Sequence, residues 1–132
     1  MHKKKTASLL LLIFISAVLT SGCTQTTSGT AIHVQAEIIQ DNNPLLSVQM
    51  EVTTTEPKAD DVIIAACKQE KLPYTYNSGM FDNFGGIAST ETDGWLLYHN
   101  GQLANVGAKD IAISEGDIIT FKYENYNAAF VK

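Results

Sequence analysis

The sequence predicts an α+β domain with a β-grasp-like architecture: an N-terminal hairpin, one helix, and then three or four strands in a mixed sheet. Three observations predict this class. Residues 31–53 alternate apolar and polar side chains about a short turn, residues 60–72 change to a helical spacing, and short apolar runs divided by glycine turns follow. A hairpin and one helix packed on a mixed sheet form a layered α+β domain.

Two alternating segments predict the hairpin. Residues 31–39 and 45–53 each repeat with period two, which is typical of half-buried strands. Residues 40–44 between them are rich in Asp, Asn and Pro, which are common in turns, so a turn is expected here. The positions expected to face the core share apolar character and are Ile32, Val34, Ala36, Ile38, Leu46, Val48, Met50 and Val52.

The helix is predicted to begin near Asp60 and Asp61, because carboxylates cap free N–H groups and favour the positive end of the helix dipole. Pro73 ends it, since proline has no amide hydrogen to continue the ladder. Its apolar stripe is Val62, Ile63, Ala66 and Cys67. Cys67 is therefore expected to be a buried, unreactive thiol.

The remainder is less regular. Residues 73–94 are predicted to form a long connection in which aromatic residues and glycines mix. A strand at 95–99 runs into Asn100-Gly101, a strong signal for a tight hairpin. Two further strands are expected at 111–114 and 118–123, with a turn over 114–117. The last residues, 125–132, are expected to add an edge strand or to fray.

The N-terminus has the pattern of a bacterial lipoprotein signal peptide over residues 1–22. A run of lysines at 3–5 precedes an apolar core at 7–19, and small residues lead to Cys23. We expect cleavage before Cys23 and lipid on its thiol, with 23–30 as a lipidated cysteine and a flexible tether. The alternatives are a secreted protein with Cys23 free and an uncleaved anchor helix. The expected location is the extracytoplasmic face of the bacterial cell membrane.

Residues 31–132 are long enough for one domain with a modest core. The chain has a formal charge of −5, and removal of the lysines at 3–5 makes it more negative. It contains no arginine. Binding to nucleic acid or directly to anionic lipid is therefore disfavoured, because both rest on clusters of Lys and Arg. A small ligand or a protein partner remains open.

Three motifs in this order resemble a known family. They are "FGGI" at 84–87, "GWLLYHNGQ" at 94–102, and "EGDI" at 115–118 before a strand ending in Tyr123. Their order and spacing resemble the bacterial domains of unknown function DUF4430, which are related to the transcobalamin C-terminal domain. The resemblance covers residues 31–124.

This resemblance implies a β-grasp ligand-binding fold. In transcobalamin-like proteins the domain covers one side of a corrinoid, and a helical domain covers the other. The helical domain has no counterpart in these residues, so the resemblance implies half of a corrinoid (cobalamin-like) site. It supports the fold and the cell-surface location more directly than the ligand.

The candidate binding residues surround the tryptophan strand. Trp95, Leu97 and His99 fall on one face of that strand, and Leu96 and Tyr98 fall on the other. One interpretation is that one face is core and the other an ordinary exposed surface. The other is that aromatic walls form a groove for a flat ligand, and Phe84 then belongs to the core. The candidate ligand-binding residues are Met80, Phe81, Trp95, Tyr98 and His99.

Metal and catalytic chemistry have weaker signals. His99 as a single ligand to a corrinoid metal is one hypothesis, but His33 is distant in sequence and no His or Cys cluster exists. Asp82, Asn83 and Asp93 could hold calcium, although they lack an EF-hand pattern. No metal site and no catalytic residue is predicted, since the chain has no nucleophile elbow, P-loop or dinucleotide motif. An enzyme is the poorer class.

Two functions therefore stand. The first is a membrane-anchored lipoprotein that binds a small molecule, with a corrinoid or another flat cofactor as the example, for a receptor or transporter. The second is a cell-surface module that binds protein or peptide and no small molecule. A sheet edge to which an extended segment adds would serve this second function.

Overall fold

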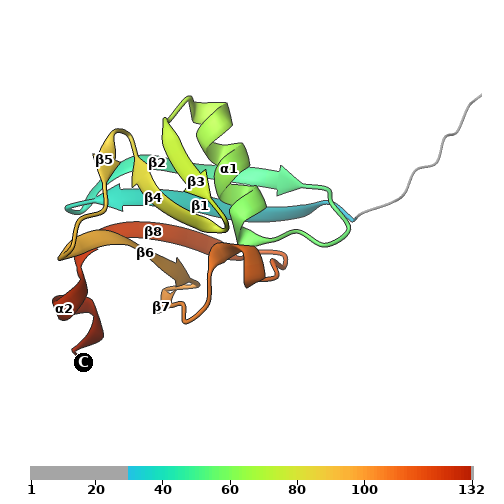
Figure 1. The fold of residues 1–132 in the computed structure, drawn as a ribbon. Helices are drawn as coiled ribbons and strands as arrows, with labels where there is room; N and C mark the ends of the chain where they lie inside the picture. Colours follow the sequence, from blue (N-terminus) through green and yellow to red (C-terminus); the bar gives the residue numbers. More distant parts are fainter. Residues whose placement is uncertain (1–29, 132) are drawn as a thin grey trace, which may run out of the picture.

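The computed structural model describes residues 30–131. The signal peptide at 1–22, the lipidated Cys23 and all but the last residue of the tether lie outside the described residues and stay predictions. Within the described part of the chain, no helix is long and apolar enough to cross a membrane. Figure 1 shows one layer of long strands with a helix and shorter strands stacked on it.

Residues 30–131 form two sheets, two α-helices and one short 3-10 helix. The elements are β1 (Ile32–Gln40), β2 (Asn43–Val52), α1 (Ala59–Glu70), β3 (Tyr74–Asn77), β4 (Met80–Phe84), β5 (Ile87–Ala88), β6 (Asp93–His99), β7 (Gln102–Leu103), a short 3-10 helix η1 (Ala108–Asp110), β8 (Ile118–Asn125) and α2 (Tyr126–Phe130). This order confirms the predicted α+β class with an N-terminal hairpin, one main helix and a mixed sheet.

The larger sheet has five strands in the order β2-β1-β8-β6-β7. β1 and β8 pair in parallel at its centre, with Ala36 opposite Ile119. The other pairs are antiparallel, and β6 meets β8 with Leu97 opposite Phe121. The N-terminal and C-terminal strands are thus neighbours, which makes β2 one outer edge and the short β7 the other.

The core lies on one face of this sheet. α1 and the second sheet, in the order β3-β4-β5, cover that face, as Figure 1 shows. The alternation predicted for β1 is confirmed, because Val34, Ala36 and Ile38 are buried there and Ile119 and Phe121 join them from β8. The opposite face carries polar side chains such as Gln35, Glu37 and Lys122.

The helix starts where the acidic residues predicted. The Asp61 carboxylate accepts the N–H of Lys58 at 3.2 Å, and so satisfies a donor at the helix start. The helix ends before Lys71, which adopts the left-handed conformation (φ 58°). Cys67 lies in the buried stripe, and burial raises the pKa of its thiol to about 12, which keeps it protonated and unreactive.

Two local predictions between α1 and β8 are wrong. Residues 73–94 are not a long connection, because Tyr74–Asn77, Met80–Phe84 and Ile87–Ala88 pair as the second sheet. The strand expected at 111–114 is only an isolated bridge between Ala112 and Lys58, and the segment there fixes the start of α1.

The C-terminal segment is also different from either expectation. It forms the short helix α2, whose first amides are capped by Asn125. The Asn125 side-chain oxygen accepts the N–H of Asn127 at 3.1 Å and of Ala128 at 3.2 Å. Asparagine is a favoured N-cap residue, so the chain begins a helix after Asn125 and does not continue as a strand.

Candidate functional site

An open apolar pocket lies between the tip of the β3–β4 hairpin and the segment that leads into η1. Its volume is about 130 Å³. Met80 and Val106 form its rim and are 71% and 49% exposed. The lining comes from β4, β6, β8 and the loop after β7, and consists of Gly79, Met80, Phe81, Trp95, Leu97, Val106, Gly107, Ala108 and Phe121.

Contact between two loops holds the pocket walls together. Gly79, at the hairpin tip, has a positive φ of 92°, and a Cβ on it would lie 2.3 Å from Cδ of Lys109 in η1. Glycine suits this position because its φ is positive, and without a side chain it leaves room for the Lys109 stem. The Lys109 stem therefore lies against the hairpin tip, next to the pocket residues Gly79 and Ala108.

Aromatic rings form the floor. Phe81 stacks on Phe84 with ring centroids 5.2 Å apart, and Phe84 meets Trp95 edge-on at 5.0 Å. Phe121 contacts both phenylalanines at 5.2 Å. Phe84 is fully buried, which confirms its assignment to the core. These contacts give the pocket a rigid, water-poor base.

Trp95 is a wall of the pocket and a member of the core. It is 7% exposed, its indole N–H donates to the Ile87 carbonyl at 2.8 Å, and its ring meets Tyr123 at 5.1 Å. Of the two faces of β6 left open by the sequence, the face of Trp95 and Leu97 is thus the core face. Trp95 therefore contributes to the pocket lining while most of its surface is packed in the core.

Tyr98 lies on the other side of the sheet. Its hydroxyl donates to the Glu124 carboxylate, and the ammonium of Lys122 lies 4.7 Å from its ring centre. Burial, together with the hydrogen bond and charge of Glu124, raises the pKa of Tyr98 to about 12. The structure therefore does not bring Tyr98 into one site with Met80, Phe81 and Trp95, because side chains alternate across a strand.

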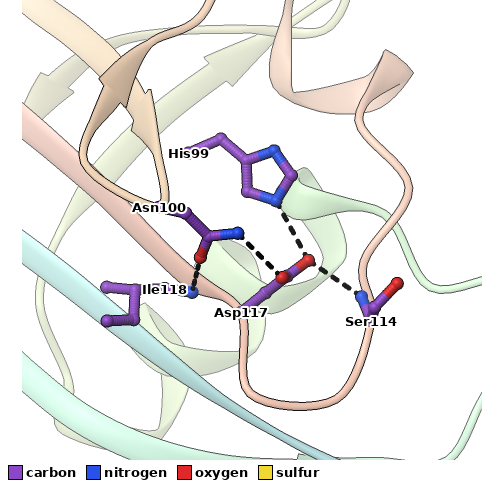
Figure 2. A network of polar contacts seen from close by, with 5 residues as sticks. All are labelled: His99, Asn100, Ser114, Asp117 and Ile118. Atoms are coloured by element: carbon purple, nitrogen blue, oxygen red, sulfur yellow. Dashed lines mark hydrogen bonds and ion pairs between the residues drawn. The ribbon is translucent and has the colours of Figure 1, made fainter.

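His99 shares the core face of β6 but lies in a polar network beyond the pocket (Figure 2). Its Nε2 is 3.0 Å from Oδ2 of Asp117. The Asn100 amide donates to the other carboxylate oxygen at 3.0 Å, and the Ser114 N–H donates to Oδ2 at 2.9 Å. The Asn100 side-chain oxygen in turn accepts the N–H of Ile118 at 2.8 Å.

This network joins the β6–β7 turn to the turn before β8. Partial burial works to raise the pKa of Asp117, but the hydrogen bonds from Asn100, His99 and the Ser114 N–H together hold it below its ordinary value. Asn100 and Gly101 both have positive φ (51° and 83°), as the predicted tight turn requires. Asn100 is thus a turn residue that also fixes Asp117.

His99 also borders a second, shallower hollow of about 310 Å³, which includes Leu103, Asn105 and Ile111. Val106 lies on the wall of both hollows. The Val106 side chain therefore separates the hollow beside His99 from the apolar pocket. Sequence reasoning placed Leu97 on the face of Trp95 without naming it as a binding residue, and it missed Val106, Ala108 and Phe121; for Val106 the signal was an apolar residue within a polar loop.

The structure gives no geometry for the calcium hypothesis. The Asn83 side chain accepts the N–H of Gly86 at 3.0 Å, and Asp93 is bonded to Thr92 and Asn125. In residues 30–131, no group of three or more His, Cys, Asp or Glu side chains is placed to hold a metal ion. The His33 side chain contacts Glu51 and Glu115, whereas that of His99 contacts Asp117.

The fold and pocket define a small α+β domain of the β-grasp type with an exposed apolar site. The chain belongs to the family described as domain of unknown function (DUF4430), whose match covers residues 57–125. The N-terminal hairpin precedes this match but supplies the centre and one edge of the larger sheet. No curated protein sequence matches the chain.

Two solved structures share the fold. Haptocorrin in complex with Cbi matches with a TM-score of 0.63 and 14% identity over 77% of this chain. The chain spans only 27% of haptocorrin. A candidate metal-binding protein from Ruminococcus gnavus matches with a TM-score of 0.50 and 13% identity, over 71% of this chain and 97% of that protein. The resemblance to a transcobalamin C-terminal-like domain is thereby confirmed at the level of fold.

Proposed function

We propose that this chain is a lipid-anchored lipoprotein on the extracytoplasmic face of a bacterial membrane, and that its domain binds a small molecule for a receptor or transporter. The observation that carries the ligand-binding part is the apolar pocket with exposed Met80 and Val106 over an aromatic floor. Large apolar side chains exposed beside a concave surface mark an interaction site.

The size of the pocket limits what enters it. At about 130 Å³, it is close to the roughly 150 Å³ cavity that holds benzene in another protein. Whole cofactors occupy pockets of about 300–1,000 Å³. We infer that one ring or one apolar substituent of the ligand enters between Met80 and Val106, and that the rest lies over the hollow beside His99.

The two solved relatives support a ligand of this kind. Haptocorrin is described in complex with Cbi, and the Ruminococcus gnavus protein as a candidate metal-binding protein. A corrinoid is therefore the first ligand to test, and other flat cofactors follow. Because the site is open, a second protein, either the receptor or the transporter, would cover the exposed side of the ligand.

The test is a titration of the soluble chain from Thr24 onward, which retains every residue of the hydrophobic core. Trp95 fluorescence is followed against cobalamin, cobinamide and a small panel of flat cofactors, with inner-filter correction and parallel calorimetry. Saturable quenching with matching heat supports the proposal. No response to any member of the panel removes corrinoids and moves the search to protein partners.

Two variants test whether the quenching arises from binding in the apolar pocket. Met80→Asp places a charge on the rim of the pocket, and Phe130→Asp places the same charge on α2, where Phe130 is 65% exposed. Both side chains are at the surface, so neither change disturbs the core. We expect Met80→Asp to abolish saturable quenching and Phe130→Asp to leave it unchanged; equal effects would argue against the pocket.

The membrane part of the proposal has its own test. Cys23→Ser removes the thiol that would carry lipid, and Cys67→Ser serves as the matched cysteine control. We expect the Cys23 variant, expressed in a bacterium with lipoprotein processing, to leave the membrane fraction and to lose labelling by an alkyne fatty acid. Retention of both signals would contradict lipid anchoring at Cys23.

A further inference from the structure

The outer edge of β2 offers unpaired main-chain groups at regular intervals. β2 is the first strand of the larger sheet and pairs only with β1. On the other side of β1, the Gln35 N–H donates to Asp117 O at 2.9 Å, and His33 O accepts the N–H of Gly116 at 2.8 Å. The main-chain groups of His33 and Gln35 therefore point toward β8 and away from β2.

The direction of the main-chain groups on β1 determines the direction of the N–H and C=O groups on β2. His33 lies opposite Glu51, Gln35 opposite Gln49, and by the same alternation Glu37 opposite Ser47. In an antiparallel ladder, residues of such non-bonded pairs direct N–H and C=O outward on both strands. The outward residues on β2 are therefore Ser47, Gln49 and Glu51, all exposed and without a main-chain hydrogen-bond partner in the described part of the chain.

The edge lacks the features that usually prevent strand pairing. β2 contains no lysine, and its one proline, Pro44, and the bulge between Ile38 and Ile39 both lie at the turn end. Natural edges are commonly protected by lysine, proline or a bulge within the strand. From Leu45 to Val52 the edge is regular and open.

The chain segment that forms β1, β2 and the turns beside them carries side-chain charges of one sign. Residues 30–57 contain Glu37, Asp41, Glu51 and Glu56 and no lysine or arginine. Glu51 lies on the same face as Gln49, and its carboxylate is 3.6 Å from Nε2 of His33. A second copy of this chain, paired through its own β2, would bring two such acidic segments together, and like charges across a pair are destabilising.

We propose that the β2 edge binds an extended, basic segment of another protein, which adds as a sixth strand to the larger sheet. Its main chain pairs with Ser47, Gln49 and Glu51. Its lysine or arginine side chains lie beside Glu51 on the open face, and its alternate apolar side chains lie beside the half-buried Val48 and Met50 on the helix face. This surface is separate from the apolar pocket.

The test uses the full chain, labelled with ¹⁵N in detergent micelles, and a short blocked peptide of alternating lysine and valine. We expect saturable binding with new hydrogen-exchange protection at the Ser47, Gln49 and Glu51 amides. A peptide with glutamate in place of lysine, and a lysine peptide interrupted by proline, should not give this protection. Equal binding of either control peptide, or protection at another edge or at none, would overturn the proposal.

Variants separate main-chain pairing from charge. Gln49→Pro removes an outward N–H without removing a bond to β1, and should weaken peptide binding about fivefold, whereas Gln49→Ala should not. Glu51→Lys should weaken binding without altering the fold, which keeps the test valid if the proline variant is unstable. Met80→Asp should bind the peptide like wild type, so a failed ligand titration and a failed strand addition are distinguishable. Self-association that Gln49→Pro abolishes would instead assign the edge to a second copy.

Discussion

The dual position of Trp95, as core residue and pocket wall, makes a quantitative prediction. Trp95→Ala removes a ring that is 7% exposed and that packs on Phe84 and Tyr123. Truncation of a buried aromatic costs about 3–5 kcal/mol. The Ile87 carbonyl also loses its indole donor, at a further cost of about 1 kcal/mol. Since small domains have total stabilities of about 5–15 kcal/mol, this loss is a large fraction of the whole.

The matched control is Met80→Ala. Met80 lines the same pocket but is 71% exposed, so its truncation should change the free energy of unfolding by less than about 0.5 kcal/mol. The assay is urea denaturation followed by far-ultraviolet circular dichroism, because the Trp95 variant has no tryptophan to report fluorescence.

The melting temperature of Trp95→Ala should also fall, on the order of 15 °C or more. The reasoning would be refuted if Trp95→Ala lost less than about 1 kcal/mol, since Trp95 would then be a surface contact and the aromatic floor would not be rigid. It would also be refuted if Met80→Ala were the more destabilising of the two.

Three further predictions follow from single contacts. Asp117→Asn should lower the free energy of unfolding at neutral pH by about 1–2 kcal/mol. Because the folded pKa of Asp117 is below the ordinary value of an aspartate, the wild-type advantage should be full above that ordinary value and should vanish as pH falls through the lower folded value; an advantage that persists at still lower pH would contradict the network. Gly94→Ala should be destabilised, because a Cβ there would lie 1.9 Å from the Tyr126 hydroxyl, and Tyr126→Phe should relieve part of this effect; an unchanged urea midpoint for Gly94→Ala would be the opposite result. Cys67 should react with a thiol reagent only at the rate of unfolding, since it is buried with a raised pKa, and rapid reaction in native buffer would show that the helix face is open.

Period-two patterns identified most of the larger sheet. The alternation of Val34, Ala36 and Ile38 is sufficient to predict β1, because one face of this strand is buried in the core and the other faces solvent. The same rule separates Trp95 from Tyr98, so the sequence itself contained the reason that these two side chains do not share a site. The second sheet was missed because β3, β4 and β5 are short and are joined by turns that contain Gly79, Gly85 and Gly86, so the whole segment resembles a loop.

The pocket was predicted only in part. Met80, Phe81 and Trp95 were identified because aromatic and sulfur side chains near a strand are typical of binding surfaces. Val106 and Ala108 complete the walls through a tertiary contact, in which the Lys109 stem packs on Gly79 across 30 positions of sequence. No local pattern encodes such an approach. His99 was predicted to bind a ligand or a corrinoid metal. In the structure its side chain instead contacts the carboxylate of Asp117 in the turn before β8.

The central claim is that the pocket between Met80 and Val106 is the ligand-binding site. The most direct measurement is a ¹H–¹⁵N chemical-shift map of the soluble chain as cobinamide, or the best ligand from the panel, is added. The account predicts shifts at the amides of residues 79–81 and 104–108 and at the indole N–H of Trp95, a residue that lines the pocket. Shifts confined to the face of Tyr98 and Glu124, or to the β2 edge, with the indole signal unmoved, would contradict it.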